Sequence, residues 1–421
     1  MKKKVIFILV ALLPIAAWGQ TMDAISQINA DSRKAYGNDY PYLFDQPALT
    51  PSPKGYKPFY ISHYGRHGSR YYWSNNLYRD IDSLLTKAHR LQLLTPEGEA
   101  FRDRFEETMP ELKARWGELS ELGWKQHQGI ANTMYHRFRK LFTKGAHVTA
   151  ISSLSGRCVM SMSAFCLELQ QQCPSLEIRE ESSRTTLDGV VPYDSQNPHQ
   201  HHCATLRPRY ESNMASFHRD TAYATRVVGR LLTSTDGLDR SDAQIAADLK
   251  NLYTSLPSIG HEGMMEGIYS DDDVVSQWEL SNLDSYSWVF ESQLEAIPIL
   301  EDILDKAQKA IDGTNGSVAD LRFGHDSCLG PLTVLMGING ADLDPADPYE
   351  VKNCYQNFET CKASNIQLIF YRNRKDDILV KCLLNGLEAS LPIPSDIRPY
   401  YHWQDVSKYY EQHINQDYPR D

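Results

Sequence analysis

The sequence predicts an α/β fold, with a doubly wound, mostly parallel sheet flanked by helices and an inserted, mainly helical cap domain. Short strand-like runs alternate with amphipathic helical segments through most of the 421-residue chain, a pattern typical of parallel sheets. Between 192 and 286 this alternation stops, and Gly, Pro and Asp clusters separate helical segments. Charged residues follow directly after three of the strand-like runs, where an open α/β sheet binds its ligands.

The chain divides into four regions on this basis. We expect a signal peptide at 1–19, an N-terminal arm at 20–55, an α/β core formed by 56–191 and 287–421, and the helical cap at 192–286. The arm contains several Pro and Gly residues, which favour irregular structure.

The first residues have the pattern of an export signal. Three lysines precede an apolar run from Val5 to Ala17, and small residues lie at Ala17 and Gly19. The run is shorter than the roughly 20 apolar residues that span a bilayer. We therefore expect cleavage near Gly19 and a periplasmic or secreted bacterial protein without a stable membrane anchor. An uncleaved anchor is the alternative.

The composition is that of an ordinary globular protein, with 23% charged and 41% hydrophobic residues. The formal net charge is −11, and loss of the three leader lysines would make it −14. Such an acidic chain repels nucleic acid at long range, so we expect no nucleic-acid partner. A negatively charged ligand would have to be attracted by a local basic pocket.

The eight cysteines permit disulfides in an exported chain, but their spacing leaves the connectivity open. No C-x-x-C pair is present. A cluster of histidines and a cysteine has spacing that fits no standard zinc site, and we expect a solvated loop there: His199, His201, His202 and Cys203. We predict neither a metal nor another cofactor.

The first strand is expected at 57–62, and the loop after it places Arg66, His67 and Arg70 close together. Two guanidiniums beside an imidazole favour a bound anion, because the planar fork of arginine matches phosphate oxygens in pairs. A neutral imidazole is a competent nucleophile toward phosphorus. This loop therefore predicts a phosphoryl-binding site, and a chance cluster in a surface loop is the alternative.

A second strand, expected at 147–153, is followed by Arg157 at the start of a helix that runs to 172. An arginine in this position can present its charge to an anion beside free backbone N–H groups, although a lone arginine is more often a surface residue. A third run, 319–327, is expected to form a strand that ends in His325 and Asp326. The carboxyl ends of such strands line one crevice, so we expect the three groups to meet.

The other core elements follow from apolar periodicity and capping residues. Ser120 is a suitable N-cap for the helix expected at 120–142. The helices are expected at 75–93, 91–115, 120–142, 292–311, 329–337 and 403–414, and two further strands at 366–371 and 378–384.

The block Arg66-His67-Gly68-Ser69-Arg70 resembles the signature of the histidine phosphatase superfamily. Gly117–Gln126 and His325-Asp326 are similar to segments of its histidine acid phosphatase and phytase branch, and the resemblance covers roughly 56 to 394. It implies that His67 is transiently phosphorylated. It also implies that four side chains hold the phosphoryl oxygens, Arg66, Arg70, Arg157 and His325, and that Asp326 protonates the leaving oxygen.

Two segments narrow the resemblance. Gly123–His127 and Arg157–Met162 are similar to bacterial proteins of the multiple inositol polyphosphate phosphatase group, although that group usually has His-Ala-Glu where this chain has Gly-His-Asp. Tyr72 stands where the family commonly has proline, and we expect altered loop rigidity there.

The resemblance implies an exported phosphomonoesterase whose substrate is a small phosphate ester, with inositol polyphosphates such as phytate in first place. A broad-specificity acid phosphatase for sugar phosphates and a non-catalytic anion-binding relative are the alternatives. His67 must be neutral to attack, and neighbouring guanidiniums lower the pKa of a histidine. We therefore predict activity at mildly acidic pH without a metal. The sequence indicates no oligomeric state.

Overall fold

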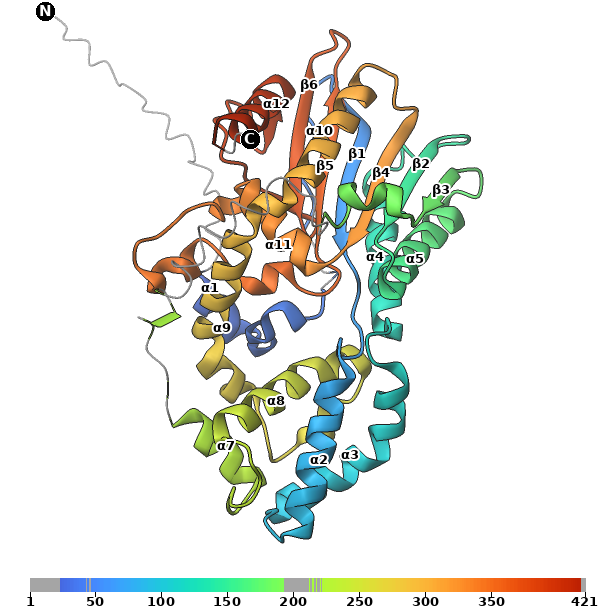
Figure 1. The fold of residues 1–421 in the computed structure, drawn as a ribbon. Helices are drawn as coiled ribbons and strands as arrows, with labels where there is room; N and C mark the ends of the chain where they lie inside the picture. Colours follow the sequence, from blue (N-terminus) through green and yellow to red (C-terminus); the bar gives the residue numbers. More distant parts are fainter. Residues whose placement is uncertain are drawn as a thin grey trace, which may run out of the picture.

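The structure, a computed structural model, describes residues 23–417 except 43, 45, 46, 193–211, 213, 216, 218, 219 and 221. The expected signal peptide and the cluster from His199 to Cys203 lie outside the described residues. A central sheet with helices on both faces occupies one end of the molecule, and a bundle of helices occupies the other (Figure 1). Within the described ranges, no helix has both the length and the apolar character needed to cross a membrane.

The sheet has the strand order β3-β2-β4-β1-β5-β6-β7, and β8 pairs with β6. Strands β1 to β4 are parallel where they pair, whereas β5 to β8 join in antiparallel fashion. The strands are β1 (Lys57–Arg66), β2 (His147–Ser152), β3 (Glu177–Glu181), β4 (Ser317–Gly324), β5 (Asn365–Arg372), β6 (Ile378–Leu384), β7 (Leu387–Ala389) and β8 (Tyr400–His402). The predicted α/β fold class is confirmed, with an antiparallel extension at one edge.

Helices cover both faces of the sheet (Figure 1). Those long enough to pack on it or in the bundle are α1 (Ala24–Ala30), α2 (Asn75–Arg90), α3 (Pro96–Arg115), α4 (Glu121–Arg137), α5 (Gly156–Gln172), α7 (Tyr223–Leu231), α8 (Asp242–Ser255), α9 (Asp271–Glu291), α10 (Ile297–Ile311), α11 (Asp326–Leu335) and α12 (Trp403–Gln412). Short helical turns are η1 (Ser32–Asp39), η2 (Arg184–Gly189), η3 (Leu256–Ile259), η4 (Glu262–Met265), η5 (Gln293–Ala296), η6 (Ile338–Gly340), η7 (Pro348–Asn353), η8 (Asn357–Thr360) and η9 (His413–Asp417).

Strand β1 shows why the sheet is covered on both faces. Successive side chains of a strand point to opposite faces. Tyr60 and Tyr64 belong to the apolar cluster that contains residues of α10 and α11, whereas Ile61 belongs to the cluster that contains residues of α4 and α5. The strand is therefore buried on both sides, and only its carboxyl end is free to carry polar groups toward a ligand.

Most predicted helices form close to their expected bounds, and Ser120 caps α4 as predicted, its hydroxyl accepting from the Gly123 N–H at 3.2 Å. The N-terminal arm differs from the prediction of irregular structure, because it contains α1 and η1. Asp23 and Asp31 cap these two elements, their carboxylates accepting from the backbone N–H of Ser26 and Arg33. Side-chain caps of this kind stabilise the start of a helix.

The helical bundle is built from two separate stretches of chain. Helices α2 and α3, which lie within the interval 56–191, share one apolar cluster with α7, α8 and the start of α9. Phe105 and Trp278, for example, are both almost fully buried in it. The described part of the interval 192–286 is mainly helical, and α9 continues past 286 to Glu291. The boundaries of the cap at 192 and 286 remain a prediction.

Candidate functional site

The three charged blocks lie together at the carboxyl edge of the sheet. Strands β1, β4 and β2 are neighbours and parallel, so the residues that follow them emerge side by side. The ring centroids of His67 and His325 are 5.6 Å apart. Arg157 Nη2 lies 3.4 Å from His325 Nδ1, and Arg66 forms an ion pair with Asp326.

His67 is fixed in place by backbone contacts and is 1% exposed. The backbone N–H of His67 donates to the carbonyl oxygen of Gly324 at 3.0 Å. The ring nitrogen Nδ1 lies 2.9 Å from the Gly68 carbonyl oxygen. A carbonyl can only accept, so Nδ1 carries the proton and Nε2 keeps its lone pair. This tautomer leaves Nε2 as the nucleophilic nitrogen.

The loop after His67 is in close contact with the start of α4. A Cβ on Gly68 would lie 2.5 Å from the Gly123 carbonyl oxygen, and a Cβ on Gly123 would lie 2.2 Å from that of Ser69. The Ser69 N–H donates to Gln126 Oε1 at 2.8 Å. Both glycines are needed for this approach, which explains how the segment Gly117–Gln126 supports the loop without taking part in chemistry.

Arg66 is a buried charge whose two terminal nitrogens, Nη1 and Nη2, both donate hydrogen bonds. Its Nη1 donates to the carbonyl oxygens of Asn38 (2.7 Å) and Thr360 (2.8 Å). Its Nη2 donates to Asp326 Oδ2 at 2.9 Å. The side chain is 1% exposed, so this arginine provides a fixed positive field beside the acid.

Arg70 and Arg157 carry unpaired donors, as does Arg66 at its Nε. Both side chains are half-buried, and the Nε of each is buried without a hydrogen-bond partner. Arg157 is the second residue of α5, and the N-cap residue Ser155 makes no side-chain cap there. Unsatisfied buried donors of this kind are suited to an anion.

The two imidazoles of the site are held neutral. Burial lowers the pKa of His67 well below its ordinary value, and the charges of Arg70 and Arg66 lower it further. Burial, followed by the charge of Arg157, lowers the pKa of His325 to about 4. His325 Nε2 also lies 3.0 Å from Ser153 Oγ. Both rings are therefore uncharged at mildly acidic pH.

Asp326 is a carboxylate in this structure. Burial raises its pKa, but the charges of Arg66, Lys362 and Arg70 outweigh that effect and leave the pKa lowered. The carboxylate thus neutralises part of the positive charge that the guanidiniums create.

Lys362, Asp39 and Asn38 belong to the site but were missed from the sequence. Lys362 Nζ lies 2.7 Å from Asp39 Oδ1, and its side chain is 2% exposed. Burial, followed by the charges of Arg66 and Arg70, lowers the pKa of Lys362 to about 7. No motif marks these residues, because the arm and the loop before β5 meet only in the folded chain.

Tyr72, at the position where the resemblance led us to expect proline, uses a backbone N–H that proline lacks. Its N–H donates to the Tyr78 hydroxyl at 2.8 Å, and its carbonyl oxygen accepts from the Gly117 N–H at 2.8 Å. Hydrogen bonds therefore hold this part of the loop where the proline ring would restrict φ.

No metal site accompanies these residues in the part of the chain that the structure describes, where no group of three or more His, Cys, Asp or Glu side chains could hold an ion. Six of the described cysteines are free thiols: Cys158, Cys166, Cys173, Cys354, Cys361 and Cys382.

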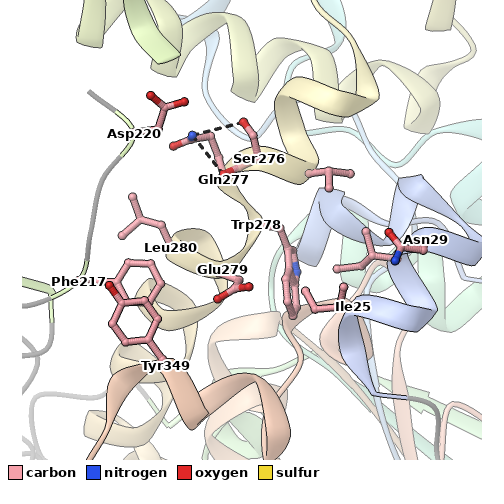
Figure 2. Close-up of a pocket in the computed structure, with 12 residues that line it drawn as sticks. Ile25, Asn29, Phe217, Asp220, Ser276, Gln277, Trp278, Glu279, Leu280 and Tyr349 are labelled. Carbon is pink, nitrogen blue, oxygen red and sulfur yellow. Dashed lines mark hydrogen bonds between the residues drawn. The ribbon is translucent and has the colours of Figure 1, made fainter. Parts of the chain in front are cut away.

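A separate hollow of about 360 Å³ lies between α1 and α9. Figure 2 shows its largely apolar lining, in which the ring of Phe217 stacks on that of Tyr349 with centroids 4.4 Å apart. None of the six predicted site residues lines it. Because it lacks a cluster of cations, this hollow is not the expected phosphate site.

No protein-family model and no curated protein matches the sequence. Solved structures do match the fold. The Bifidobacterium longum multiple inositol polyphosphate phosphatase in complex with inositol hexasulfate has a TM-score of 0.72 and 18% identity over 89% of this chain and 96% of that one. The phytase of D. castellii has a TM-score of 0.72 and 14% identity over 96% and 91%. The Hafnia alvei phytase has a TM-score of 0.52 and 13% identity over 86% and 98%.

Proposed function

We propose that the protein is a histidine acid phosphatase that hydrolyses phosphomonoesters through a phosphohistidine on His67. One observation carries the proposal: a neutral, buried imidazole lies among three guanidiniums at the end of adjacent parallel strands. Phosphoryl transfer needs an oriented nucleophile and neutralisation of the phosphoryl oxygens. The shared fold with phytases and with an inositol polyphosphate phosphatase supports the same reaction.

In the first step, His67 Nε2 attacks phosphorus in line and the bond to the ester oxygen breaks. Arg70, Arg157 and His325 hold the non-bridging oxygens, together with the fixed charge of Arg66. Asp326 gives a proton to the departing alcohol oxygen. In the second step, Asp326 as carboxylate takes a proton from water, which attacks the phosphohistidine and releases inorganic phosphate.

Asp326 must acquire a proton for the first step, although its pKa is lowered in the free protein. A bound phosphate dianion would neutralise the guanidinium charges that lower this pKa and would compete for Arg66 Nη2, which now donates to the acid. Both effects raise the pKa of the carboxyl group. Substrate binding therefore favours protonation of Asp326, and mildly acidic pH favours the reaction.

Inositol polyphosphates are the proposed substrates, with phytate as the representative. Two further lysines support a substrate with several phosphates: Lys362, in the loop before β5, and Lys250, in α8. Burial lowers the pKa of Lys250, although the charges of Asp284 and Asp39 oppose this shift. The alternatives are a broad-specificity phosphatase for sugar phosphates and a non-catalytic anion-binding relative. Export through cleavage near Gly19 is part of the proposal, and the mass of the mature N-terminus tests it.

The deciding experiment compares phosphate release from phytate, glucose 6-phosphate and p-nitrophenyl phosphate, with His67→Ala as control. We expect release with the wild-type protein, none with His67→Ala, and a phosphorylated histidine trapped on rapid acid quenching only when His67 is present. Equal rates on the three esters would remove the inositol phosphate assignment. A wild-type protein that binds phosphate but releases none from any ester would favour the non-catalytic alternative.

A further inference from the structure

We propose that a groove beside Arg157 binds an aromatic ring carried by the alcohol part of the phosphate ester. The inference rests on the proposed phosphatase function and assigns the place where the organic part of an aromatic phosphate monoester binds. The groove has a volume of about 680 Å³, within the range of small-molecule sites. Its lining includes Trp73, Trp116, Gly156, Arg157 and Met160.

Three large apolar side chains are exposed in this one groove. Trp73 is 58% exposed, Trp116 50% and Met160 46%. They come from the loop after Arg70, the end of α3 and the first turns of α5. Single exposed apolar residues are ordinary, but a group that the fold assembles from three segments marks a binding surface.

The groove continues into the phosphate site. Arg157 lines it, and the Nη2 of the same side chain reaches His325 at 3.4 Å. A Cβ on the neighbouring Gly156 would meet no heavy atom within 4 Å, so the wall beside Arg157 is open. An ester whose phosphate lies between Arg157 and His67 has this groove available for its organic part.

The charges of the groove favour a ring over a second phosphate. Arg115 is paired with Glu118 at 3.1 Å, and Glu121 with Lys125 at 2.6 Å. Apart from Arg157, the lining therefore offers no uncommitted cation. Indole rings stack on aromatic rings, and a methionine thioether makes favourable contacts with ring edges. The lining chemistry selects a flat, weakly charged ring.

The test compares 1-naphthyl phosphate with glycerol 2-phosphate, which has no ring. We expect Trp116→Ala and Trp73→Ala each to raise KM for 1-naphthyl phosphate about tenfold, the factor that corresponds to roughly 1.4 kcal/mol of lost stacking. KM for glycerol 2-phosphate should change less than about twofold. Trp288→Ala is the matched control, because Trp288 is 43% exposed and lies on α9, outside the groove.

Equal changes in KM for the two esters, or no change in KM for 1-naphthyl phosphate, would overturn the proposal that the groove binds the ring. A wild-type protein that hydrolyses neither ester would refute the proposed function instead. In that case equilibrium binding of 1-naphthyl phosphate, followed by indole fluorescence, tests the groove alone. A roughly tenfold weaker binding of 1-naphthyl phosphate by Trp116→Ala supports the ring site. Absence of binding, or equal binding by Trp116→Ala and the wild type, overturns it.

Discussion

Acidification should destabilise this protein through two buried histidines outside the proposed chemistry. His63, in β1, packs against Phe165 and Phe323, and His127, in α4, packs against Phe323. All four ring nitrogens are buried without a hydrogen-bond partner. Burial lowers the pKa of each histidine to about 3 from the ordinary value of 6.5. Both rings therefore remain neutral in the fold at pH values where they are charged in the unfolded chain.

The sign and size of the effect follow from proton linkage. Below pH 6.5 the unfolded state binds more protons than the fold, so the free energy of unfolding falls as the pH falls toward 3. For a shift from 6.5 to about 3, each histidine removes about 2 kcal/mol between pH 7 and pH 5, and the pair removes about 4 kcal/mol. This is a large part of the stability of an ordinary domain.

Urea unfolding at pH 7 and pH 5, followed by far-UV circular dichroism, measures this loss. We expect the double variant His63→Leu/His127→Leu to lose about 4 kcal/mol less than the wild type between the two pH values. His136→Leu, an exposed position on the same helix as His127, is the control and should behave as the wild type. If the wild type and the double variant lose the same free energy, the buried rings are not the cause of acid sensitivity.

Three further predictions concern the site. Arg157→Ala should lower kcat/KM on p-nitrophenyl phosphate about 100-fold by removing charge-assisted contacts. Arg157→Lys should recover part of the lost kcat/KM. Equal activity of Arg157→Ala and the wild type would exclude a role in phosphate binding. Asp326→Asn should reduce kcat about 100-fold more on glucose 6-phosphate than on p-nitrophenyl phosphate, because p-nitrophenolate leaves without a proton; equal losses would argue against Asp326 as the acid. EDTA treatment should leave the rate unchanged, and a loss that a divalent ion restores would contradict the metal-free mechanism.

The sequence allowed the core of the site to be predicted because that core depends on strand ends. His67, Arg157 and His325 each follow a strand, and the strand pattern brings such positions to one edge. Lys362 and Asp39 could not be found in this way, because their ion pair depends on how η1 packs near the loop before β5. Periodicity likewise predicted α2 and α3 as helices but could not identify α7 and α8 as their packing partners.

The hydrogen bonds of Arg66 connect the pocket to two segments that are distant in the sequence. Its guanidinium is held by carbonyl oxygens of Asn38 and Thr360, and the Thr360 hydroxyl in turn donates to Asn38 Oδ1 at 3.0 Å. A chain that starts after residue 40 would lack the Asn38 carbonyl oxygen, so Arg66 Nη1 would keep only its hydrogen bond to the Thr360 carbonyl oxygen. The N-terminal arm therefore contributes directly to holding the guanidinium beside Asp326.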